Sequence, residues 1–250
     1  MTYPFSTPNP VTKYDVIDEI PERAMVIYAH PDDAEIGAGA TAALWAAQGC
    51  EITYVQCTTG SSGSNDNEMT SDRIVEIRAV EQRAAADVIG VGDIVVLDHP
   101  DGELEADRAF LGEVVHAIRK YRPEVVFAHD QHRFSGFQHR DHRHVGIMVQ
   151  DAIYPYARDH LHFPEQLVNR VEPYKVKHLL FWGSDQPDAI VDVSDSVDTK
   201  IHALAKHESQ LPGLSFGSDI DMRIRSQHTE TAKGYGFLYG ETFRRLIART

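Results

Sequence analysis

The stretch Ala24-Met25-Val26-Ile27-Tyr28-Ala29-His30-Pro31-Asp32-Asp33 decides the fold of this chain. Its apolar half predicts a buried strand, and the proline and acids that follow predict that the strand ends abruptly. The imidazole and the two carboxylates therefore fall at the carboxyl end of a strand, where open α/β sheets place their ligand crevice. His30 and Asp33 could bind one divalent metal there, with Asp32 beside them free to move protons. A hydrogen-bonded histidine followed by helix-capping aspartates explains this stretch equally well when it is read in isolation.

A second cluster of histidines and acids, residues 139–144, follows another predicted strand end. The apolar run over residues 125–128 precedes it, and His129 stands directly after that run. His139 and His142 are three residues apart, so at the start of a helix both side chains lie on one face. Catalytic zinc takes three protein ligands and leaves one position for water, and two histidines with one carboxylate would supply them. A solvated loop explains the second cluster alone, but two such clusters at strand ends favour a metal site.

Predicted strands and helices alternate along the chain. This βαβ pattern implies an α/β, Rossmann-like fold, with a mainly parallel sheet and helices on both faces. Residues 1–23 are predicted to form an N-terminal extension and residues 24–250 a single domain, with the site at the carboxyl ends of the strands. Residues 154–177 and 211–234 are expected to be irregular and to frame the mouth of the pocket. The predicted strands are residues 24–29, 51–57, 94–97, 124–128, 178–182 and 189–193, and the predicted helices are residues 35–48, 73–89 (capped by Ser71 or Asp72), 107–121, 197–207 and 235–248.

The segment Gly37-Ala38-Gly39 is a fragment of the dinucleotide-binding pattern Gly-x-Gly-x-x-Gly. The acidic residue that such a site needs at the end of the second strand is missing, because Thr58 and Thr59 stand there. Close packing of a helix on the sheet is therefore the preferred interpretation of these glycines.

The charge of the chain excludes nucleic acid as a general partner. The 250 residues include 38 acids and 24 bases, which give a net charge of −14 and leave no basic excess to neutralise phosphates. No apolar run approaches the ~18 residues of a membrane span, and residues 1–20 lack the apolar core of a signal peptide. Cys50 and Cys57 form no Cys-x-x-Cys metal motif. We expect a cytoplasmic protein.

The two clusters resemble the signature motifs of a known family, the LmbE-like or PIG-L-type zinc-dependent deacetylases, which remove acetyl groups from N-acetylglucosamine conjugates. The family pattern opens with a strand and His-Pro-Asp-Asp, matched here by residues 30–33. Its later pattern, His-x-Asp-His with a glycine four residues on, is matched by His139, Asp141, His142 and Gly146. The similarity runs from about residue 24 to residue 247. It continues through weaker matches at Glu35, residues 36–41, Arg78-x-x-Glu81, Asp101-Gly102, Lys200, His207-x-Ser209-Gln210 and Glu241-x-Phe243.

The resemblance implies that His30, Asp33 and His142 bind Zn²⁺, one ion per chain, with another divalent metal such as Fe²⁺ as an alternative. Spacing alone permits the two neighbouring aspartates to exchange roles. It also leaves three further histidines open as contributors to the site: His129, His132 and His144.

The resemblance also assigns the steps of amide hydrolysis to this chain. Asp32 takes the proton of the attacking water, whose pKa the metal lowers from about 15.7 toward 7. His139 holds the oxyanion together with the metal, and Asp141 orients His139 and favours its protonated form. Either His139 or the protonated Asp32 then delivers a proton to the leaving amine.

Arg78 and Asp101 fall where sugar-binding members of the family contact the substrate, although Arg78 equally suits a structural ion pair with Glu76 or Glu81. We expect a zinc-dependent hydrolase that cleaves an N-acyl amide, in the first place an N-acetyl group on an amino-sugar conjugate. The expected partner is a small-molecule N-acyl substrate, and the expected assembly is a homo-oligomer. A metal-dependent hydratase on the same fold and a non-catalytic metal- or sugar-binding protein are the alternatives.

Overall fold

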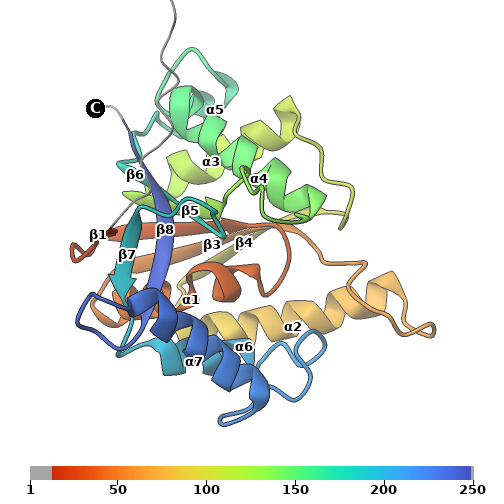
Figure 1. Cartoon of the computed structure of the whole chain (residues 1–250). Coiled ribbons are helices and arrows are strands. Elements are labelled where there is room, and N and C mark those ends of the chain that lie inside the picture. The colour runs from red at the N-terminus through yellow and green to blue at the C-terminus, as the bar shows by residue number, and fades with distance from the viewer. Residues whose placement is uncertain (1–12, 249–250) are drawn as a thin grey trace, which may run out of the picture.

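Residues 13–248 are described by the computed structural model, and their strands form one eight-stranded sheet with helices on both faces (Figure 1). The strand order is β1-β7-β8-β6-β5-β2-β3-β4. Neighbouring strands run parallel except at β8, which runs antiparallel to both β6 and β7. The predicted α/β, mainly parallel sheet is confirmed. The strands are β1 (Asp15–Val16), β2 (Arg23–Tyr28), β3 (Glu51–Thr58), β4 (Asp93–His99), β5 (Val125–His129), β6 (His178–Trp182), β7 (Ala189–Asp192) and β8 (Gly240–Ile247).

The helices form two layers, one on each side of the sheet. In Figure 1, α1, α2, α6 and α7 lie below the sheet, and α3, α4 and α5 lie above it. A large apolar cluster fills each of the two interfaces between helices and sheet. The helices are α1 (Asp33–Ala47), α2 (Ser71–Ile89), α3 (Arg108–Tyr121), α4 (Arg140–Asp151), the short irregular helix η1 (Ala152–Tyr156), α5 (Glu165–Val168), α6 (Val197–Leu204) and α7 (Asp219–Ala232).

Strand β2 shows why the central strands are continuous apolar runs in the sequence. Ala24, Val26 and Tyr28 belong to the apolar cluster on the α1 side, whereas Met25 and Ile27 belong to the cluster on the α3 side. Successive side chains of a strand point to opposite faces, so a strand covered on both faces must be apolar at every position. The polar residues that follow β2 are therefore forced to the end of the strand.

The predicted helix over residues 235–248 is wrong, because this segment contains strand β8. Gly234 and Gly236 adopt positive φ angles of 85° and 86°, which interrupt any helix before it can begin. Phe243 is fully buried in the core, while the exposed fraction rises toward Ile247 at the end of the strand. Pairing on both edges with β6 and β7 outweighs the weak helical pattern of the sequence.

Helix α7 lies inside the segment 211–234, which was expected to be irregular. The Ser218 side chain caps it by accepting a hydrogen bond from the backbone N–H of Asp221, a start signal present in the sequence. Most of the helix is polar, so its apolar periodicity is too weak to predict it. Helix α2 is capped by Thr70, which accepts from the N–H of Arg73, and not by Ser71 or Asp72 as expected.

The described part of the N-terminal extension joins the edge of the sheet. Strand β1 pairs in parallel with β7, and the Asp15 carboxylate accepts a hydrogen bond from Arg245 at 2.6 Å. Residues 1–12 of the predicted extension lie outside the described residues.

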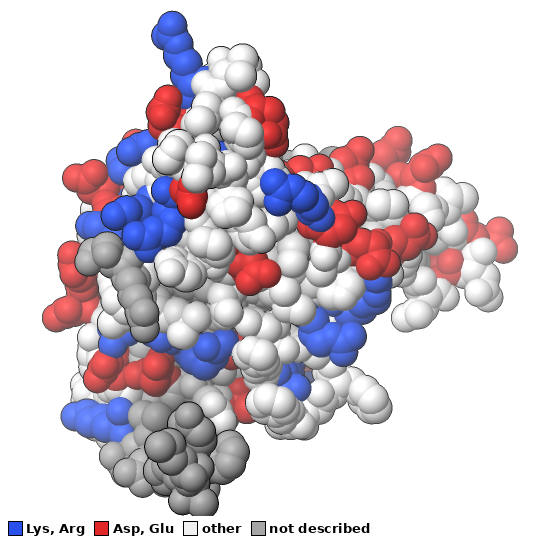
Figure 2. All heavy atoms as spheres, turned by 90° about the horizontal axis from the view of Figure 1, so that it is seen from above, with Lys and Arg blue, Asp and Glu red and all other residues white. Residues whose placement is uncertain are grey.

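The surface agrees with the acidic composition. On the face shown in Figure 2, basic and acidic side chains are interspersed, and no continuous basic surface covers that face. Within residues 13–248, no helix has the length and apolar character that crossing a membrane would require.

Candidate active site

Histidines and acids from distant parts of the sequence meet at the carboxyl ends of the strands. Residues 30–33 follow β2, Asp101 follows β4, and His129 is the last residue of β5. The first turn of α4 adds Asp141 and His142. The ends of parallel strands share one edge of the sheet, so side chains 112 positions apart come within hydrogen-bonding distance.

Three of these side chains face one another closely enough to share a metal ion. His30 Nδ1 lies 3.2 Å from His142 Nε2 and 3.3 Å from Asp33 Oδ2, and His142 Nε2 lies 3.2 Å from Asp33 Oδ1. Ligands held about 2.0–2.1 Å from a tetrahedral zinc ion are about 3.4 Å apart. The observed spacings and the donor set of two imidazoles and one carboxylate therefore fit a catalytic zinc ion.

The other nitrogen of His30 is held by two carboxylates. His30 Nε2 lies 3.1 Å from Asp101 Oδ1 and 3.2 Å from Asp141 Oδ2. Burial lowers the pKa of His30, but hydrogen bonds to Asp101, Asp141 and Asp33 outweigh burial and raise it to about 11, so a metal ion that binds at Nδ1 must displace a proton from it. The structure thus places Asp101 and Asp141 against His30, where they fix the orientation of the ring and present Nδ1 to the metal position.

His129 is a fourth histidine of the cluster, and sequence reasoning left its role open. It is buried, its ring stacks on His142 with 3.9 Å between centroids, and its Nε2 lies 3.4 Å from Asp33 Oδ2. Burial lowers the pKa of His129 to about 4, so the ring stays neutral beside the ligands. Its place at the end of β5 was the sequence signal that could have assigned His129 to the cluster.

Gly146 explains how α4 comes so close to this histidine. A Cβ atom at Gly146 would lie 2.5 Å from the backbone oxygen of His129 and 3.0 Å from the backbone nitrogen of Gln131. Only glycine permits this approach of helix to strand end, and the approach brings His142 onto His129.

His30, Asp33 and His142 are called the ligand triangle below. Asp32 stands beside the metal position but is not part of this triangle. Its backbone is in the left-handed region at φ 96°, and its side chain makes no capping hydrogen bond to α1. Two residues of α2 hold this strained turn: Gln82 Oε1 accepts the N–H of Asp32 at 3.0 Å, and Arg78 donates to the oxygen of Pro31 at 2.6 Å. Burial and the neighbouring Asp33 raise the pKa of Asp32 to about 8, against the opposing charge of Arg78.

The structure places Arg78 against this turn. The guanidinium is buried, and it lies 3.4 Å from Asp32 Oδ2 and donates to the Gly60 oxygen at 3.2 Å. Glu81, one of its expected ion-pair partners, instead accepts hydrogen bonds from Ser209. Arg78 is therefore positioned to orient Asp32.

Replacing Arg78 by methionine should lower kcat by roughly 10- to 100-fold with metal content retained, because the turn that carries Asp32 loses its main hydrogen bonds. Steady-state kinetics and metal analysis of the same preparation measure both quantities. Arg83→Met is the matched control on α2, because Arg83 binds the Val91 oxygen and Asp87 away from the cluster. A raised KM at unchanged kcat would instead assign Arg78 to substrate binding.

His139 lies at the solvent side of the cluster. Its side chain is 45% exposed, its ring packs edge-on against His30 at 4.5 Å, and its Nδ1 accepts the N–H of Asp141. The structure turns His144 away from the cluster, toward the backbone oxygen of Leu104 at 2.6 Å. Among the described residues, neither His132 nor His144 belongs to a group that could hold a metal ion.

Comparison with known proteins agrees with this geometry. The model of the PIG-L family, described as GlcNAc-PI de-N-acetylase, matches residues 25–153, just over half of the chain. The chain belongs to the PIG-L family. The matched region contains every residue of the ligand triangle, and the family resemblance of the two motifs is confirmed.

Relatives of this PIG-L protein include characterised sugar deacetylases. It is 32% identical over 192 residues to a diacetylchitobiose deacetylase of Thermococcus kodakarensis, covering 76% of this chain and 71% of that protein. The N,N'-diacetylchitobiose deacetylase structure from Pyrococcus horikoshii superposes with a TM-score of 0.83 at 27% identity, covering 91% of this chain and 84% of that one. A 4-carboxy-2-hydroxymuconate hydratase from Pseudomonas putida has a TM-score of 0.76 at 21% identity, covering 92% and 98%, and shares the fold alone.

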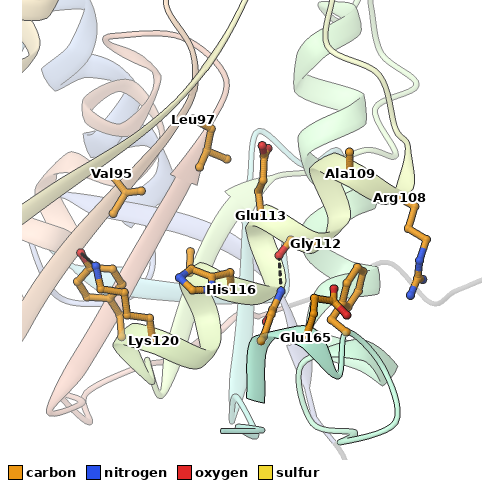
Figure 3. A pocket seen from close by; sticks show the side chains of 13 residues that line it. Val95, Leu97, Arg108, Ala109, Gly112, Glu113, His116, Lys120 and Glu165 are labelled. Carbon is orange, nitrogen blue, oxygen red and sulfur yellow. Dashed lines mark hydrogen bonds between the residues drawn. The ribbon is translucent and has the colours of Figure 1, made fainter. Parts of the chain in front are cut away.

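Two cavities of this PIG-L protein are large enough for a small molecule. One, of about 500 Å³, is lined by Asp33, His129 and His142 and extends from the cluster toward α7. The other, of about 630 Å³, lies between β4 and α3 and contains none of the cluster residues (Figure 3). Figure 3 shows Val95 and Leu97 of β4 on one side and Glu113, His116 and Lys120 of α3 on the other. The chemistry of the cluster therefore belongs to the first cavity.

A buried ion pair fixes the helix that carries Asp33. Lys200 Nζ donates to Glu241 Oε1 at 2.7 Å and to the Ile36 oxygen of α1 at 2.9 Å, and Glu241 Oε2 accepts the N–H of Thr41. Nearby, Gly37 permits the Trp182 indole to lie against α1, since a Cβ there would be 2.4 Å from the ring. The expected close packing of helix on sheet is confirmed at Gly37, whereas Gly39 lies against Lys200 of α6.

Glu241→Gln should lower the free energy of unfolding by about 3–5 kcal/mol at pH 7, because it leaves the Lys200 charge buried and unpaired. Burial disfavours the charged form of Glu241, but Lys200 and His228 outweigh burial and hold its pKa at about 2. The stability that Glu241 contributes is therefore present above about pH 4.5 and is lost as the pH falls toward 2. Denaturant unfolding across this range should show the variant and the parent converging. Glu230→Gln, in an exposed pair with Lys233, should change stability by about 0.5 kcal/mol or less at every pH.

Proposed function

We propose that this protein is a metal-dependent hydrolase that cleaves N-acyl amides of amino-sugar conjugates. The observation that carries the proposal is the triangle of His30, Asp33 and His142, with the partly buried carboxylate of Asp32 held beside it and outside it. Three protein ligands and a separate proton acceptor are what amide hydrolysis at a metal site requires. The deacetylase names of the Thermococcus and Pyrococcus relatives support the substrate class.

His30, Asp33 and His142 would hold the metal, which supplies Lewis-acid activation of the amide carbonyl and of a water molecule. Asp32 accepts the proton of the attacking water, and its orientation depends on Arg78 and Gln82. The carbon–nitrogen bond then breaks, and a proton passes from His139 or from Asp32 to the leaving amine. The products are a carboxylic acid and a free amine.

Asp101 and Asp141 support this reaction from behind His30. Asp141 is fully buried. Its Oδ2 accepts the N–H of Gly102 at 2.7 Å and also lies 3.2 Å from His30 Nε2. A carboxylate behind a ligating imidazole fixes its tautomer and increases its basicity. Contacts of Asp101 and Arg78 with a sugar remain predictions from the family resemblance.

Release of free amine from a panel of N-acetylglucosamine conjugates tests the proposed function. Zinc-loaded protein should release amine, and chelated protein should not. The proposal would be overturned if zinc-loaded protein with one ion bound per chain released no amine from N-acetyl sugars or from sugars with longer N-acyl groups. Hydration of an unsaturated acid by the same preparation would then favour the hydratase, whose fold this chain shares.

We further propose a single catalytic domain over residues 24–250, since one sheet includes strands from residue 15 to residue 247. A cytoplasmic location is supported by Cys50 and Cys57, which are buried free thiols. The homo-oligomer expected from the sequence is tested by sedimentation velocity of the full chain.

A further inference from the structure

The cavity at the cluster is much larger than an acetyl group needs. Its volume is about 500 Å³, whereas a methyl group is similar in size to a water molecule, which occupies about 30 Å³. We propose that this cavity is an acyl pocket, and that the enzyme removes apolar acyl chains longer than acetyl. This inference rests on the proposed function and names the acyl part of its substrate.

One part of the cavity wall, formed by α6, the loop after it and the first half of α7, is apolar, whereas Gln227, His228 and Thr231 make the second half of α7 polar. Ile220 and Ile224 lie one turn apart on the same face of α7, and both are only partly buried in the small apolar cluster between α6 and α7. Leu204 of α6 and Leu211 of the following loop extend this surface. A hydrocarbon chain that covered it would remove apolar area from water on both partners.

Ile36 provides the link between this wall and the metal position. It lies in the first turn of α1, three residues after Asp33, and lines the same cavity. Its side chain is 51% exposed although its neighbours Glu35 and Gly37 are buried. An isoleucine left open inside a cavity, next to a metal ligand, is suited to an apolar group that arrives with the substrate.

The position of the proton donors assigns the cavity to the acyl side of the amide. Among the described residues, neither His139 nor Asp32, which are proposed to hand a proton to the amine, lines this cavity. The leaving amine must lie within reach of one of them. The half-exposed His139 leaves room for a bulky sugar on that side, so the acyl group extends in the other direction, into the cavity.

Three of the titratable groups that line the cavity, Lys200, Glu241 and His228, contact one another, and Arg133 lines the cavity elsewhere. Lys200 donates to Glu241, to the Ile36 oxygen and to His228 Nε2, and His228 Nδ1 lies 2.9 Å from the Ile224 oxygen. An acyl chain that ended in a carboxylate would have to break these contacts. An uncharged hydrocarbon chain leaves them intact, which favours simple fatty acyl groups.

The test compares N-acetyl-, N-butanoyl- and N-hexanoyl-glucosamine as substrates of the metal-loaded full chain. Each added CH₂ that enters the cavity should raise kcat/KM by about fourfold, so hexanoyl, which has four more CH₂ groups, should exceed acetyl by about 250-fold if all four enter and by at least about tenfold if only two do. Ile224→Asn should reduce the hexanoyl-to-acetyl ratio by about tenfold, since it places an amide on the apolar wall. Met222→Asn is the matched control, because Met222 is an exposed apolar residue of α7 that does not line the cavity.

A second readout does not depend on turnover. Calorimetry should show that hexanoate, a product of the reaction, binds at least about tenfold more tightly than acetate, and that Ile224→Asn removes the difference. Acetyl substrates cleaved faster than hexanoyl substrates would overturn the acyl pocket and leave the proposed hydrolase intact. If no sugar amide is hydrolysed, the proposed hydrolase is overturned. Equal dissociation constants for hexanoate and acetate would then overturn the acyl pocket as well.

Discussion

His142→Ala should lose the metal and the activity together. His142 Nε2 lies within 3.2 Å of both His30 Nδ1 and Asp33 Oδ1, so its removal takes away one of three ligands. A site with two ligands no longer holds a catalytic zinc ion tightly. Metal analysis after dialysis should show near-zero zinc where the parent has one ion per chain, and amine release should fall to the level of chelated protein.

His144→Ala is the control for this variant. His144 stands two residues further along α4, but its ring faces the Leu104 oxygen. Its removal takes away the same side chain from the same helix and should leave the zinc content at one ion per chain. Full zinc content in His142→Ala would show that a set without His142, such as His30, Asp101, His139 and Asp141, provides the metal site.

Asp32→Asn should retain zinc and lower kcat by roughly 10²–10⁴-fold, the range of a lost general base. Asn has the size of Asp, and its side-chain oxygen can still accept the hydrogen bond from Arg78 Nη2 that Asp32 receives at 3.4 Å. Its amide has no capacity to take a proton from water at neutral pH. Single-turnover kinetics with metal analysis separates this loss of chemistry from a loss of metal.

Asp98→Asn is the matched control for Asp32→Asn. Asp98 also has a left-handed backbone, at φ 64°, but its side chain is exposed and lies outside the cluster. The Asp98→Asn variant should retain one zinc ion per chain and the kcat of the parent protein. Loss of stoichiometric zinc from Asp32→Asn would mean that the roles of Asp32 and Asp33 are exchanged.

The first half of the fold could be predicted because its signals are local. Buried parallel strands such as β2 and β5 are apolar at every position and end at polar residues, and the intervening helices have clear caps or terminal glycines. In the last third β6, β7 and α6 were predicted, but β8 and α7 were not. Strand β8 is held by two antiparallel neighbours, and α7 is held by contacts with β8 and α6, so neither depends mainly on its own sequence pattern.

The candidate site shows the same limit. Strand ends predicted that the two clusters meet, and the family resemblance selected His30, Asp33 and His142 from them; the structure brings their ligand atoms within 3.3 Å. The contacts of Arg78 with Pro31 and of Asp101 with His30 are long-range and polar, and no periodicity encodes them. Sequence spacing can bring residues to one edge of a sheet, but it cannot say which of them touch each other there.

The place of β8 in the sheet also determines when this protein can become an enzyme during its synthesis. β8 follows the other described strands in the sequence, yet it lies between β6 and β7 in the interior of the sheet. Until it emerges, β7 and β1 have no strand that connects them to the rest of the sheet, and the cavity lacks the part of its wall that residues 240–242 provide. A chain interrupted before residue 240 therefore lacks an interior strand of the sheet and part of the cavity wall.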